Sequence, residues 1–365
     1  MKLLLIGFQP LSEINYPHLE QTVRYLRSQG ADYCLFRERG YFLGEKTKPG
    51  DFPRASARTL LNYANIFVDT FRLLIKRIKH RYDVTIAVDN FSYFVASRIF
   101  PNVILWSHDF LTDDEPRSKS AIQRFIFRQV RKCLLQQRRI IIQDRERLRL
   151  FMETYLGGPD QETLDAFLLP VSVMGESKTV SDKPSEPPVL MQIGGINKWR
   201  SHSDLLLQNY QTEHRVYALA FHGFIDQEMA ELIANAKVPP SVSDVVVASG
   251  DIHKIVEKCD IGFIAYGATN KNFYYIARAS GQIAEFTRCC KPLVILGDNN
   301  MRQTLETEKF GISISTIDEL PAAVRTIHEN YGVYSGNSRQ AFNHTYDLSR
   351  HLSGLKNWIF AESRN

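Results

Sequence analysis

The sequence lacks the signatures of several protein classes. Its five cysteines are scattered, with no CxxC pair or zinc-binding spacing, so we expect free thiols in a reducing compartment. No uninterrupted apolar stretch reaches the roughly 18 residues that a membrane-spanning helix needs, and the N-terminal apolar run is too short for a signal peptide. We therefore expect a cytoplasmic protein, which could also bind peripherally to the inner face of the membrane.

Two binding motifs are also missing. The chain has no GxGxxG motif, so nothing supports an NAD-binding first domain. No Asp-x-Asp motif follows a predicted strand, because Asp113 and Asp114 are adjacent rather than spaced. We accordingly expect neither a metal site nor a bound cofactor.

What is present indicates two globular domains. The chain has 365 residues, of which 44% are hydrophobic and 23% charged, and domains usually hold roughly 100–200 residues. Residues 1–175 carry 26 Lys and Arg against 19 Asp and Glu (net +7), whereas residues 176–365 carry 19 against 21 (net −2). The positive first half indicates an anionic partner, and a membrane surface, a nucleic acid and a phosphorylated substrate all qualify.

Short apolar runs alternate with amphipathic stretches, which is typical of a parallel sheet covered by helices. The alternation begins with a strand at Leu3–Ile6 and restarts at Val189, after a polar, Pro-rich segment. We therefore predict two Rossmann-like α/β domains that face each other across a cleft. Their bounds are 1–175 and 189–345, with a linker at 176–188 and a terminal helical region at 346–365. Strands predicted in the second domain include Val245–Val247, Ile261–Ala265 and Leu293–Leu296.

The most informative stretch is residues 279–295, which predicts a turn, a helix, a break at Lys-Pro and a buried strand. Ser280 is a plausible N-cap, and the amides of Gly281 and Gln282 follow it at the positive end of the helix dipole. Such a helix start can bind a diphosphate, and Glu285, about one turn further on, could accept two ribose hydroxyls. An ordinary capped helix with a surface Glu285 explains the same residues.

This stretch resembles the donor-binding segment of the retaining GT-B glycosyltransferases of family 4. Glu285 precedes Pro292 by seven residues and matches the second of two glutamates in the family motif, which implies ribose binding. Ser280 and Gly281 match the turn that holds the diphosphate. The first family glutamate, which touches the donor sugar, is replaced by Ala277. The resemblance implies a GT-B fold, an acceptor-binding first domain, a nucleotide-sugar-binding second domain, and a C-terminal helix that crosses back to the first.

The family places cationic groups just after the first strand of the second domain, where they offset the charge of the leaving diphosphate. That loop here contains Gly194 and Gly195, followed by Lys198 and Arg200. The resemblance implies that the glycines line the donor site and that one or both cations act on the diphosphate. Ile196 replaces the usual family Arg, and a solvated loop is the alternative explanation.

In the first domain, His108 and Asp109 follow a predicted strand at Val103–Trp106. The family has a similar His-Asp pair, which contacts the donor sugar or the acceptor. His108 could donate a hydrogen bond to the sugar or transfer a proton near neutral pH. A purely structural histidine is the alternative.

Two segments of the first domain are strongly basic. Residues 71–81 hold five Lys and Arg and no acid, and residues 117–149 hold eleven against two acids. These cations could simply form the solvated faces of core-packed helices, or they could bind anionic lipid. Nucleic acid is disfavoured, because no recognition motif accompanies the charge.

The resemblance favours transfer of a sugar from a nucleotide-diphosphate sugar to an envelope glycan or its lipid-linked precursor. It also implies retention of configuration and no metal requirement. Two alternatives share the same architecture: a sugar-nucleotide epimerase, and a non-catalytic GT-B module that partners another transferase. Ala277 favours the second alternative.

Overall fold

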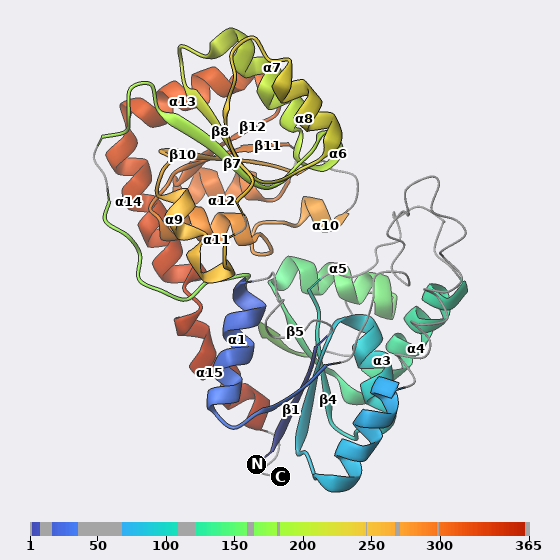
Figure 1. The fold of residues 1–365 in the computed structure, drawn as a ribbon. Coiled ribbons are helices and arrows are strands. Elements are labelled where there is room, and N and C mark those ends of the chain that lie inside the picture. Colours follow the sequence, from blue (N-terminus) through green and yellow to red (C-terminus); the bar gives the residue numbers. More distant parts are fainter. Residues whose placement is uncertain are drawn as a thin grey trace. The chain divides into compact units, whose positions relative to one another are not determined.

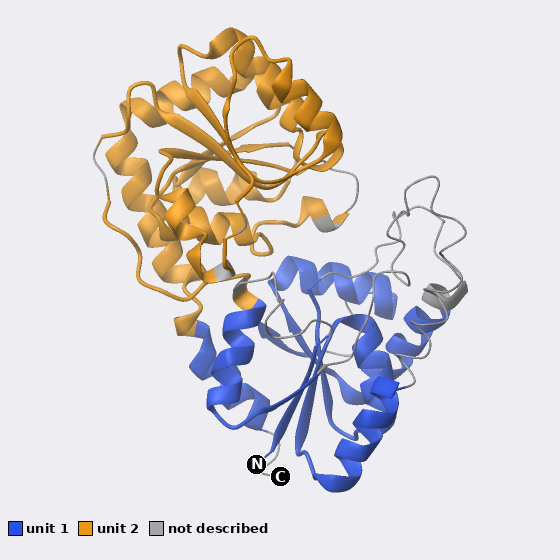
Figure 2. Cartoon of the chain, viewed as in Figure 1, with its two compact units in different colours: residues 1–15, 19–169, 351–365 blue, residues 16–18, 170–350 orange. Residues whose placement is uncertain are grey.

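The chain forms two α/β units, drawn as a ribbon in Figure 1. The computed structural model describes residues 2–7, 17–35, 68–108, 121–158, 164–180, 183–245, 247–266, 271–297 and 299–361. Unit 1 comprises residues 1–15, 19–169 and 351–365, and unit 2 comprises residues 16–18 and 170–350 (Figure 2). Residues 176–188 therefore fall inside unit 2.

Unit 1 is built on a six-stranded parallel sheet with the order β2-β1-β3-β4-β5-β6. The strands are β1 (Leu3–Gly7), β2 (Asp32–Leu35), β3 (Val84–Val88), β4 (Val103–Trp106), β5 (Arg139–Ile142) and β6 (Asp165–Leu168). Strands β1, β3, β4 and β5 are buried throughout. Such continuous burial, on both faces, explains their unbroken apolar sequences.

Helices cover both faces of this sheet (Figure 1). They are α1 (Pro17–Ser28), helix 68–79, α3 (Asp89–Ile99), α4 (Ala121–Gln137), α5 (Arg145–Leu156) and α15 (Ser349–Ala361). Right-handed crossovers put α1 on one face, because the chain steps from β1 to β2 in one direction. Helix 68–79, α3, α4 and α5 share the other face, because all later steps run the opposite way.

Residues 351–361 of α15 complete unit 1, although they follow unit 2 in the sequence. The Trp358 indole donates to Asp165 at 2.8 Å and its ring lies beside Phe167, with centroids 5.6 Å apart. The Arg139 guanidinium stacks over Trp358 at 4.3 Å and donates to the carbonyl of Ile359. These contacts attach the end of the chain to β5 and β6.

Unit 2 contains a second six-stranded parallel sheet, with the order β12-β11-β10-β7-β8-β9. The strands are β7 (Val189–Ile196), β8 (Ala218–Ile225), β9 (Ser241–Ser243), β10 (Ile261–Ala265), β11 (Leu293–Leu296) and β12 (Gly311–Ile314). Together the two parallel sheets, each flanked by helices, confirm the predicted α/β fold class.

The helical segments of unit 2 follow in chain order: α6 (Lys198–Ser201), α7 (Ser203–Glu213), α8 (Gln227–Ala234), η3 (Ser249–Asp251), α9 (His253–Val256), α10 (Lys271–Tyr274), α11 (Gly281–Arg288), α12 (Met301–Glu308), η4 (Ile317–Glu319), α13 (Leu320–Glu329), α14 (Tyr331–Ala341) and η5 (Phe342–Tyr346). Alternate side chains of each strand enter separate cores. Helices α7, α8 and α13 pack on one face, and α9, α11 and α12 pack on the other.

One predicted strand is wrong. Val245 and Val247 are not in a strand, and the last edge of the sheet is β9 at Ser241–Ser243 instead. The apolar run suggested a buried strand, but Val245 is largely exposed. Pairing with β8, in which Ala220 lies opposite Ser241, sets the position of β9.

Candidate functional site

The carboxyl ends of β7 and β10 define the candidate site in unit 2. Strand β7 begins the unit, after which β8 and β9 add on one side and β10, β11 and β12 on the other. The chain thus reverses its direction across the sheet between β7 and β10. In open α/β sheets such a reversal leaves a crevice at the carboxyl ends of the two strands, where ligands bind.

Helix α11 begins at this edge of the sheet. Ser280 caps it, and the Ser280 hydroxyl oxygen accepts the Ile283 amide at 3.4 Å. The amides of Gly281 and Gln282 precede Ile283 in the first turn, where a helix offers them no backbone acceptor. The Ser280 hydroxyl also lies 2.7 Å from the hydroxyl of Tyr266, the residue that follows β10. The predicted cap is therefore present, and its free amides suit an anion.

The glycines at the end of β7 allow a close approach of three segments. Gly194 has a φ of +98°, and a Cβ there would lie 2.8 Å from the Gln282 side-chain nitrogen. That nitrogen donates to the carbonyl of Ile193 at 2.7 Å, which joins α11 to β7. On the neighbouring strand, a Cβ on Gly223 would overlap the Gly194 carbonyl. Gln282 therefore uses its side chain to hold the loop, while Gly195 lies exposed beside Gly194.

Glu285 carries the most unusual environment in the site. Only 3% of the residue is exposed, and its Oε2 is buried without a hydrogen-bond partner among the described residues. Burial raises the pKa of this carboxyl to about 7, while the nearby Arg288 charge acts in the opposite direction. A buried oxygen without a partner costs free energy in the empty protein. A ligand with hydroxyl groups would supply the missing donors.

Arg288 lies one turn after Glu285 on α11. Its guanidinium is 4.0 Å from the Glu285 carboxylate and 3.4 Å from Nδ1 of His253 on α9. The segment that leads into unit 2 crosses this guanidinium at Gly175, whose φ is +133° and where any Cβ would overlap it. Lys178 then donates its amide to the Arg288 carbonyl at 2.9 Å. These contacts fix the cation beside Glu285.

Arg200 follows the carboxyl end of β7. It belongs to α6, which follows β7, and its guanidinium stacks over the Phe273 ring at 5.1 Å. Phe273 stacks in turn on Tyr266, with centroids 6.2 Å apart. Since Tyr266 hydrogen bonds Ser280, this chain of contacts joins Arg200 to the cap of α11. Two aromatic rings thus connect the Arg200 guanidinium with the N-cap residue of α11.

Lys198, the other predicted cation, is already paired. Its ammonium lies 2.7 Å from the carboxylate of Glu228 on α8, and this hydrogen bond raises the Lys198 pKa. The pairing directs the charge of Lys198 toward α8. Of the two candidates, the geometry favours Arg200.

A buried hydrogen-bond network fixes the loop that carries both cations. The Asn197 side chain caps α6 by accepting the amide of Arg200 at 2.9 Å. Beneath it, Gln192 donates to the Ser201 carbonyl and accepts from the Ser203 hydroxyl. Because a buried polar network is stable only when its members are paired, these bonds hold α6 in one orientation.

Ala277, at the position of the first family glutamate, is buried and has no side-chain polar atom. Its amide donates to Asn300 at 3.0 Å, and its carbonyl accepts the Tyr346 hydroxyl at 2.7 Å. Asn300 and Tyr346 therefore hold the backbone just before the Ser280 turn. No carboxylate stands at this position.

His108 lies in unit 1, directly beyond the carboxyl end of β4. Its amide donates to Asp89, its carbonyl accepts from Arg147 at 3.0 Å, and its ring stacks on Trp106. Burial, assisted by the charge of Arg147, lowers the pKa of the imidazole to about 3. A neutral imidazole at physiological pH suits a hydrogen-bond donor and does not suit a proton carrier. Asp109 lies outside the described residues.

Sequence reasoning missed three contributors to the site. Tyr266 and Phe273 connect Arg200 with Ser280, and His253 contacts Arg288. Tyr266 and Phe273 both follow β10. Because ligands bind at the carboxyl ends of strands in such sheets, this position could have identified them as candidates. No local sequence signal identifies His253, because its partner Arg288 lies 35 residues further along the chain.

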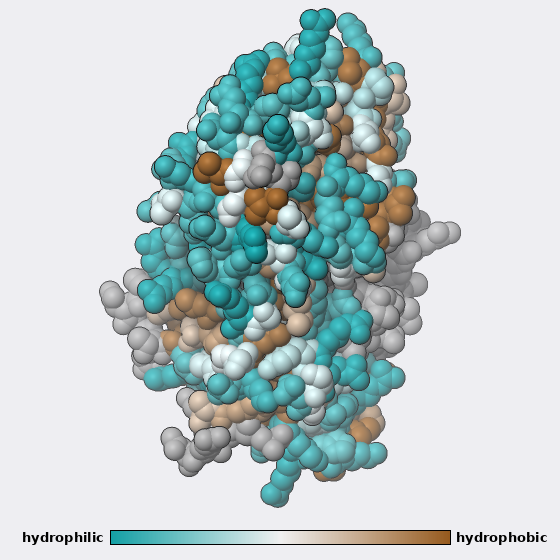
Figure 3. All heavy atoms as spheres, turned by 90° about the vertical axis from the view of Figure 1, so that its left-hand side faces the viewer, coloured by the Kyte–Doolittle hydropathy of each residue, from teal (hydrophilic) through white to brown (hydrophobic). Residues whose placement is uncertain are grey.

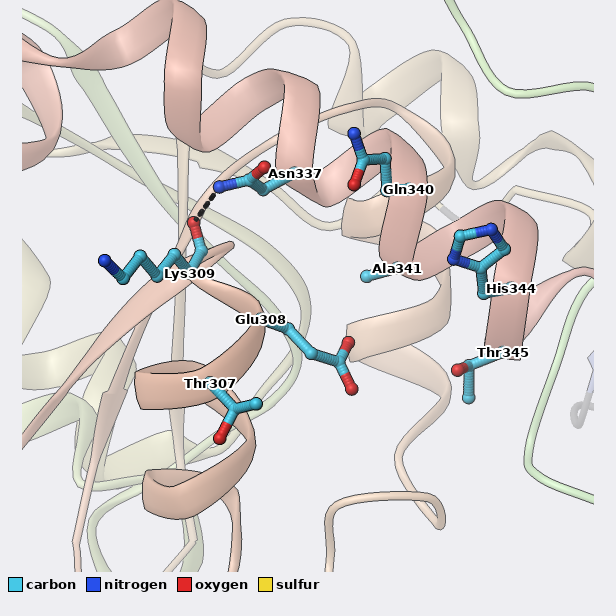
Figure 4. A pocket seen from close by; sticks show the side chains of 8 residues that line it. All are labelled: Thr307, Glu308, Lys309, Asn337, Gln340, Ala341, His344 and Thr345. Atoms are coloured by element: carbon cyan, nitrogen blue, oxygen red, sulfur yellow. Dashed lines mark hydrogen bonds between the residues drawn. The ribbon is translucent and has the colours of Figure 1, made fainter.

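A separate cavity of about 530 Å³ lies between the end of α12 and the α14–η5 segment (Figure 4). Asn337 donates to the Lys309 carbonyl at 3.0 Å along this cavity, and the Glu308 carboxylate points toward the same space. Glu308 also pairs with Arg278 at 3.0 Å. Because α12 ends just before β12 begins, this cavity lies beside the amino end of β12 and is distinct from the α11 site.

The described residues offer neither a metal-binding cluster nor a helix that could span a membrane. They contain no group of three or more His, Cys, Asp or Glu side chains arranged to hold a metal ion. Likewise, none of the helices seen there combines the length and apolar character of a membrane span.

Solved structures of other proteins resemble nearly the whole chain. HepE from Anabaena, in complex with UDP-glucose, has a TM-score of 0.69 at 13% identity, covering 99% of this chain and 100% of HepE. Sucrose-phosphate synthase from Thermosynechococcus elongatus has a TM-score of 0.66 at 13% identity, covering 99% of each chain. WaaG, a glycosyltransferase involved in lipopolysaccharide biosynthesis, has a TM-score of 0.60 at 12% identity, covering 98% of this chain and 99% of WaaG. The chain has the GT-B fold.

The GT-B fold confirms the predicted architecture. The sequence matches no protein-family model and no curated protein. At these identities the likeness is one of fold, so the functions of individual residues are argued from the geometry of the site.

Proposed function

We propose that this protein transfers a glycosyl group from a UDP-sugar to a glycan or lipid-linked acceptor. This proposal rests on the arrangement on α11, where the amides at the helix start stand one turn before a buried carboxylate oxygen that has no hydrogen-bond partner in the part of the chain that the structure describes. A nucleoside diphosphate has both complementary groups: an anionic diphosphate and a ribose diol. Two structures of HepE, with UDP and with UDP-glucose, support uracil as the base.

In this proposal the second unit holds the donor. The amides of Gly281 and Gln282 bind the diphosphate, Arg200 balances its growing charge as the sugar leaves, and Glu285 accepts the ribose hydroxyls. The bond between the anomeric carbon and the phosphate oxygen breaks, and the acceptor hydroxyl forms the new bond. The proton of that hydroxyl leaves with the UDP phosphate, so the reaction balances without a redox partner.

We assign His108 to a hydrogen bond with the transferred sugar, because its imidazole is neutral at physiological pH. Retention of configuration follows from the resemblance to family 4. A lipid-linked acceptor would place the reaction at the cytoplasmic face of a membrane.

Ala277 supports one alternative, a GT-B module that binds donor without transferring it. With no carboxylate at this position, a contact expected for the donor sugar is missing. In this alternative the protein binds UDP at the same site but does not catalyse transfer.

Product analysis with UDP-glucose as the probe separates these functions. The purified chain is incubated with UDP-glucose alone and with a mixture of envelope glycans and lipid-linked acceptors, and sugar nucleotides and glycans are then analysed. Acceptor-dependent release of UDP with a new glycan supports the transferase. Isomerised donor without acceptor identifies an epimerase, and binding without any product identifies the non-catalytic module.

A further inference from the structure

Helix 68–79 of unit 1 exposes a continuous apolar stripe. Ile78 is 84% exposed and Phe71 57%, and Val68 and Leu74 are also exposed, whereas Leu73 on the opposite side is fully buried. At 100° per residue, the four exposed side chains fall within about 120° of the helix circumference. Single exposed apolar residues are common, but an aligned set on one helix indicates a contact surface.

Exposed cations flank this stripe, and the single acid of the helix pairs with only one of them. Arg72, Lys79 and Arg81 are exposed, while the one acid of the helix, Asp69, is 2% exposed and paired with Arg72 at 3.1 Å. The helix therefore presents apolar and positive groups together. Soluble proteins usually keep these two kinds of group on opposite faces of a helix.

Helix α4 repeats the pattern on the same face of the sheet. Phe125 is 46% exposed and Leu135 39%, at a spacing that also brings Arg128 and Lys132 to the surface. Between Ala121 and Gln137 the sequence contains no acid. Because Ile126, Val130 and Leu134 fill the core-facing side, Phe125 is not needed there.

Helix α3 joins the two helices into one surface. Arg77 of helix 68–79 donates to the carbonyl of Ile99 at the end of α3. On the other side of α3, Arg98 donates to Gln129 of α4 at 2.8 Å and stacks over Phe94, whose ring contacts Phe125. The exposed sides of these three helices therefore form a continuous face of unit 1.

We propose that this face binds to an anionic phospholipid bilayer, with the exposed apolar side chains entering the headgroup region and the cations contacting lipid phosphates. We call it the lipid-binding face and define it by Phe71, Ile78, Lys79, Arg81, Phe125 and Lys132. Charge complementarity identifies the partner as anionic, and the apolar stripe favours lipid over a soluble polyanion. Lipid binding would place the proposed glycosyl transfer at a membrane surface. It can be measured whether or not the protein catalyses that transfer.

The surface drawn in Figure 3 differs from the lipid-binding face. Figure 3 displays a surface on which hydrophilic residues dominate and hydrophobic residues occur in small, separate areas. The isolated exposed residues of unit 2, such as Val333 on α14, fit this pattern. They provide matched controls for the lipid-binding face.

The test measures co-sedimentation of the full chain with vesicles of phosphatidylcholine, with and without 30% phosphatidylglycerol, chosen as the anionic probe. Two face variants are compared, each with a matched control: the apolar double variant Phe71→Ser with Ile78→Ser, and the charge variant Lys79→Gln with Arg81→Gln and Lys132→Gln. The controls are Leu232→Ser with Val333→Ser, and Arg215→Gln with Lys237→Gln and Arg350→Gln, all exposed in unit 2. Circular dichroism and thermal melting check that every variant is folded.

We expect the wild type to bind only the anionic vesicles, more weakly as salt rises. Both face variants should lose at least tenfold in affinity, and the controls should match the wild type. Failure of the wild type to bind overturns the proposal, as does an apolar variant that binds normally. A concentration-dependent dimer that these same variants abolish would instead assign the face to a second copy of the chain. UDP binding, measured on the same samples, distinguishes a wrong lipid-binding face from a wrong donor site.

Discussion

The Arg288 guanidinium lies 4.0 Å from the Glu285 carboxylate within one helix, and both side chains are almost fully buried. The distance is too long for a hydrogen bond but short enough for charge stabilisation. Arg288 therefore favours the ionised form of Glu285 while leaving Oε2 free to accept a ligand hydroxyl. This relationship makes the affinity of the site depend on pH.

UDP affinity should rise with pH around neutrality. Glu285 accepts both ribose hydroxyls only when ionised, and its pKa is raised to about 7, so below pH 7 affinity should fall up to tenfold per pH unit. Removing the charge in Arg288→Met should move the midpoint to higher pH, while Arg288→Lys should largely preserve it. Calorimetric titration of UDP between pH 6 and 9 measures both midpoints. Equal loss of affinity by Arg288→Met at every pH would show that Arg288 does not act through ionisation.

Stability of the empty protein should show the opposite dependence. A carboxyl whose folded pKa is raised above the ordinary value of 4.5 contributes stability that is complete below pH 4.5 and lost as pH rises through about 7. Glu285→Gln removes this penalty, so it should stabilise the protein at pH 8 by up to about 3 kcal/mol and have little effect at pH 5. Thermal melting at both pH values tests this, with Glu308→Gln as control. A uniform loss of stability in Glu285→Gln would refute the assigned environment.

Arg200 should contribute more to transfer than Lys198. Arg200 stacks over Phe273, which is linked through Tyr266 to the α11 cap, whereas Lys198 is paired with Glu228. Arg200→Gln should lower kcat at least tenfold, because it removes a cation that stabilises the leaving diphosphate, and Lys198→Gln should change kcat less than threefold. Steady-state kinetics of UDP release compares the two. If Lys198→Gln lowered kcat more than Arg200→Gln, Lys198 would be the cation that stabilises the leaving diphosphate.

The glycines of the site should differ sharply in their tolerance of a side chain. Gly223→Ala would drive a Cβ into the Gly194 carbonyl at a φ of +135°, so we expect destabilisation of about 2 kcal/mol or more. Gly281→Ala places its Cβ 3.8 Å from Val171, an ordinary contact, and should keep the wild-type melting temperature. Denaturant unfolding of both variants gives the two free energies. A stable Gly223→Ala would show that the close approach of β7 and β8 is not required.

Local sequence signals predicted the centre of the site well. Ser280 caps α11, and strands β10 and β11 coincide with the predicted Ile261–Ala265 and Leu293–Leu296. In each case an N-cap residue or a bounded apolar run determines the structure within a few neighbouring residues. The fold class follows from the same signals, because alternating strands and helices leave few arrangements other than parallel sheets.

Long-range contacts determine the features that the sequence did not reveal. Helix α14 contains Gly336 and two serines, which are poor helix formers, and it was not predicted. In the structure, the Ser335 hydroxyl donates to the carbonyl of Cys290, and that of Ser338 to Lys291. Similarly, the sequence alone could not show which of Lys198 and Arg200 is already paired. The partner of Lys198, Glu228, lies 30 residues further along the chain.

The central claim is that α11 binds the UDP part of a sugar nucleotide through its free amides and Glu285. Calorimetric titration of UDP into the wild type, Glu285→Gln and the cavity control Glu308→Gln tests it most directly. We expect binding by the wild type, a loss of about 10- to 100-fold in Glu285→Gln, and no change in Glu308→Gln, since hydrogen bonds to a charged group contribute about 1.5–3 kcal/mol. UDP binding that is equally strong in wild type and Glu285→Gln, or no binding by the wild type, would contradict it.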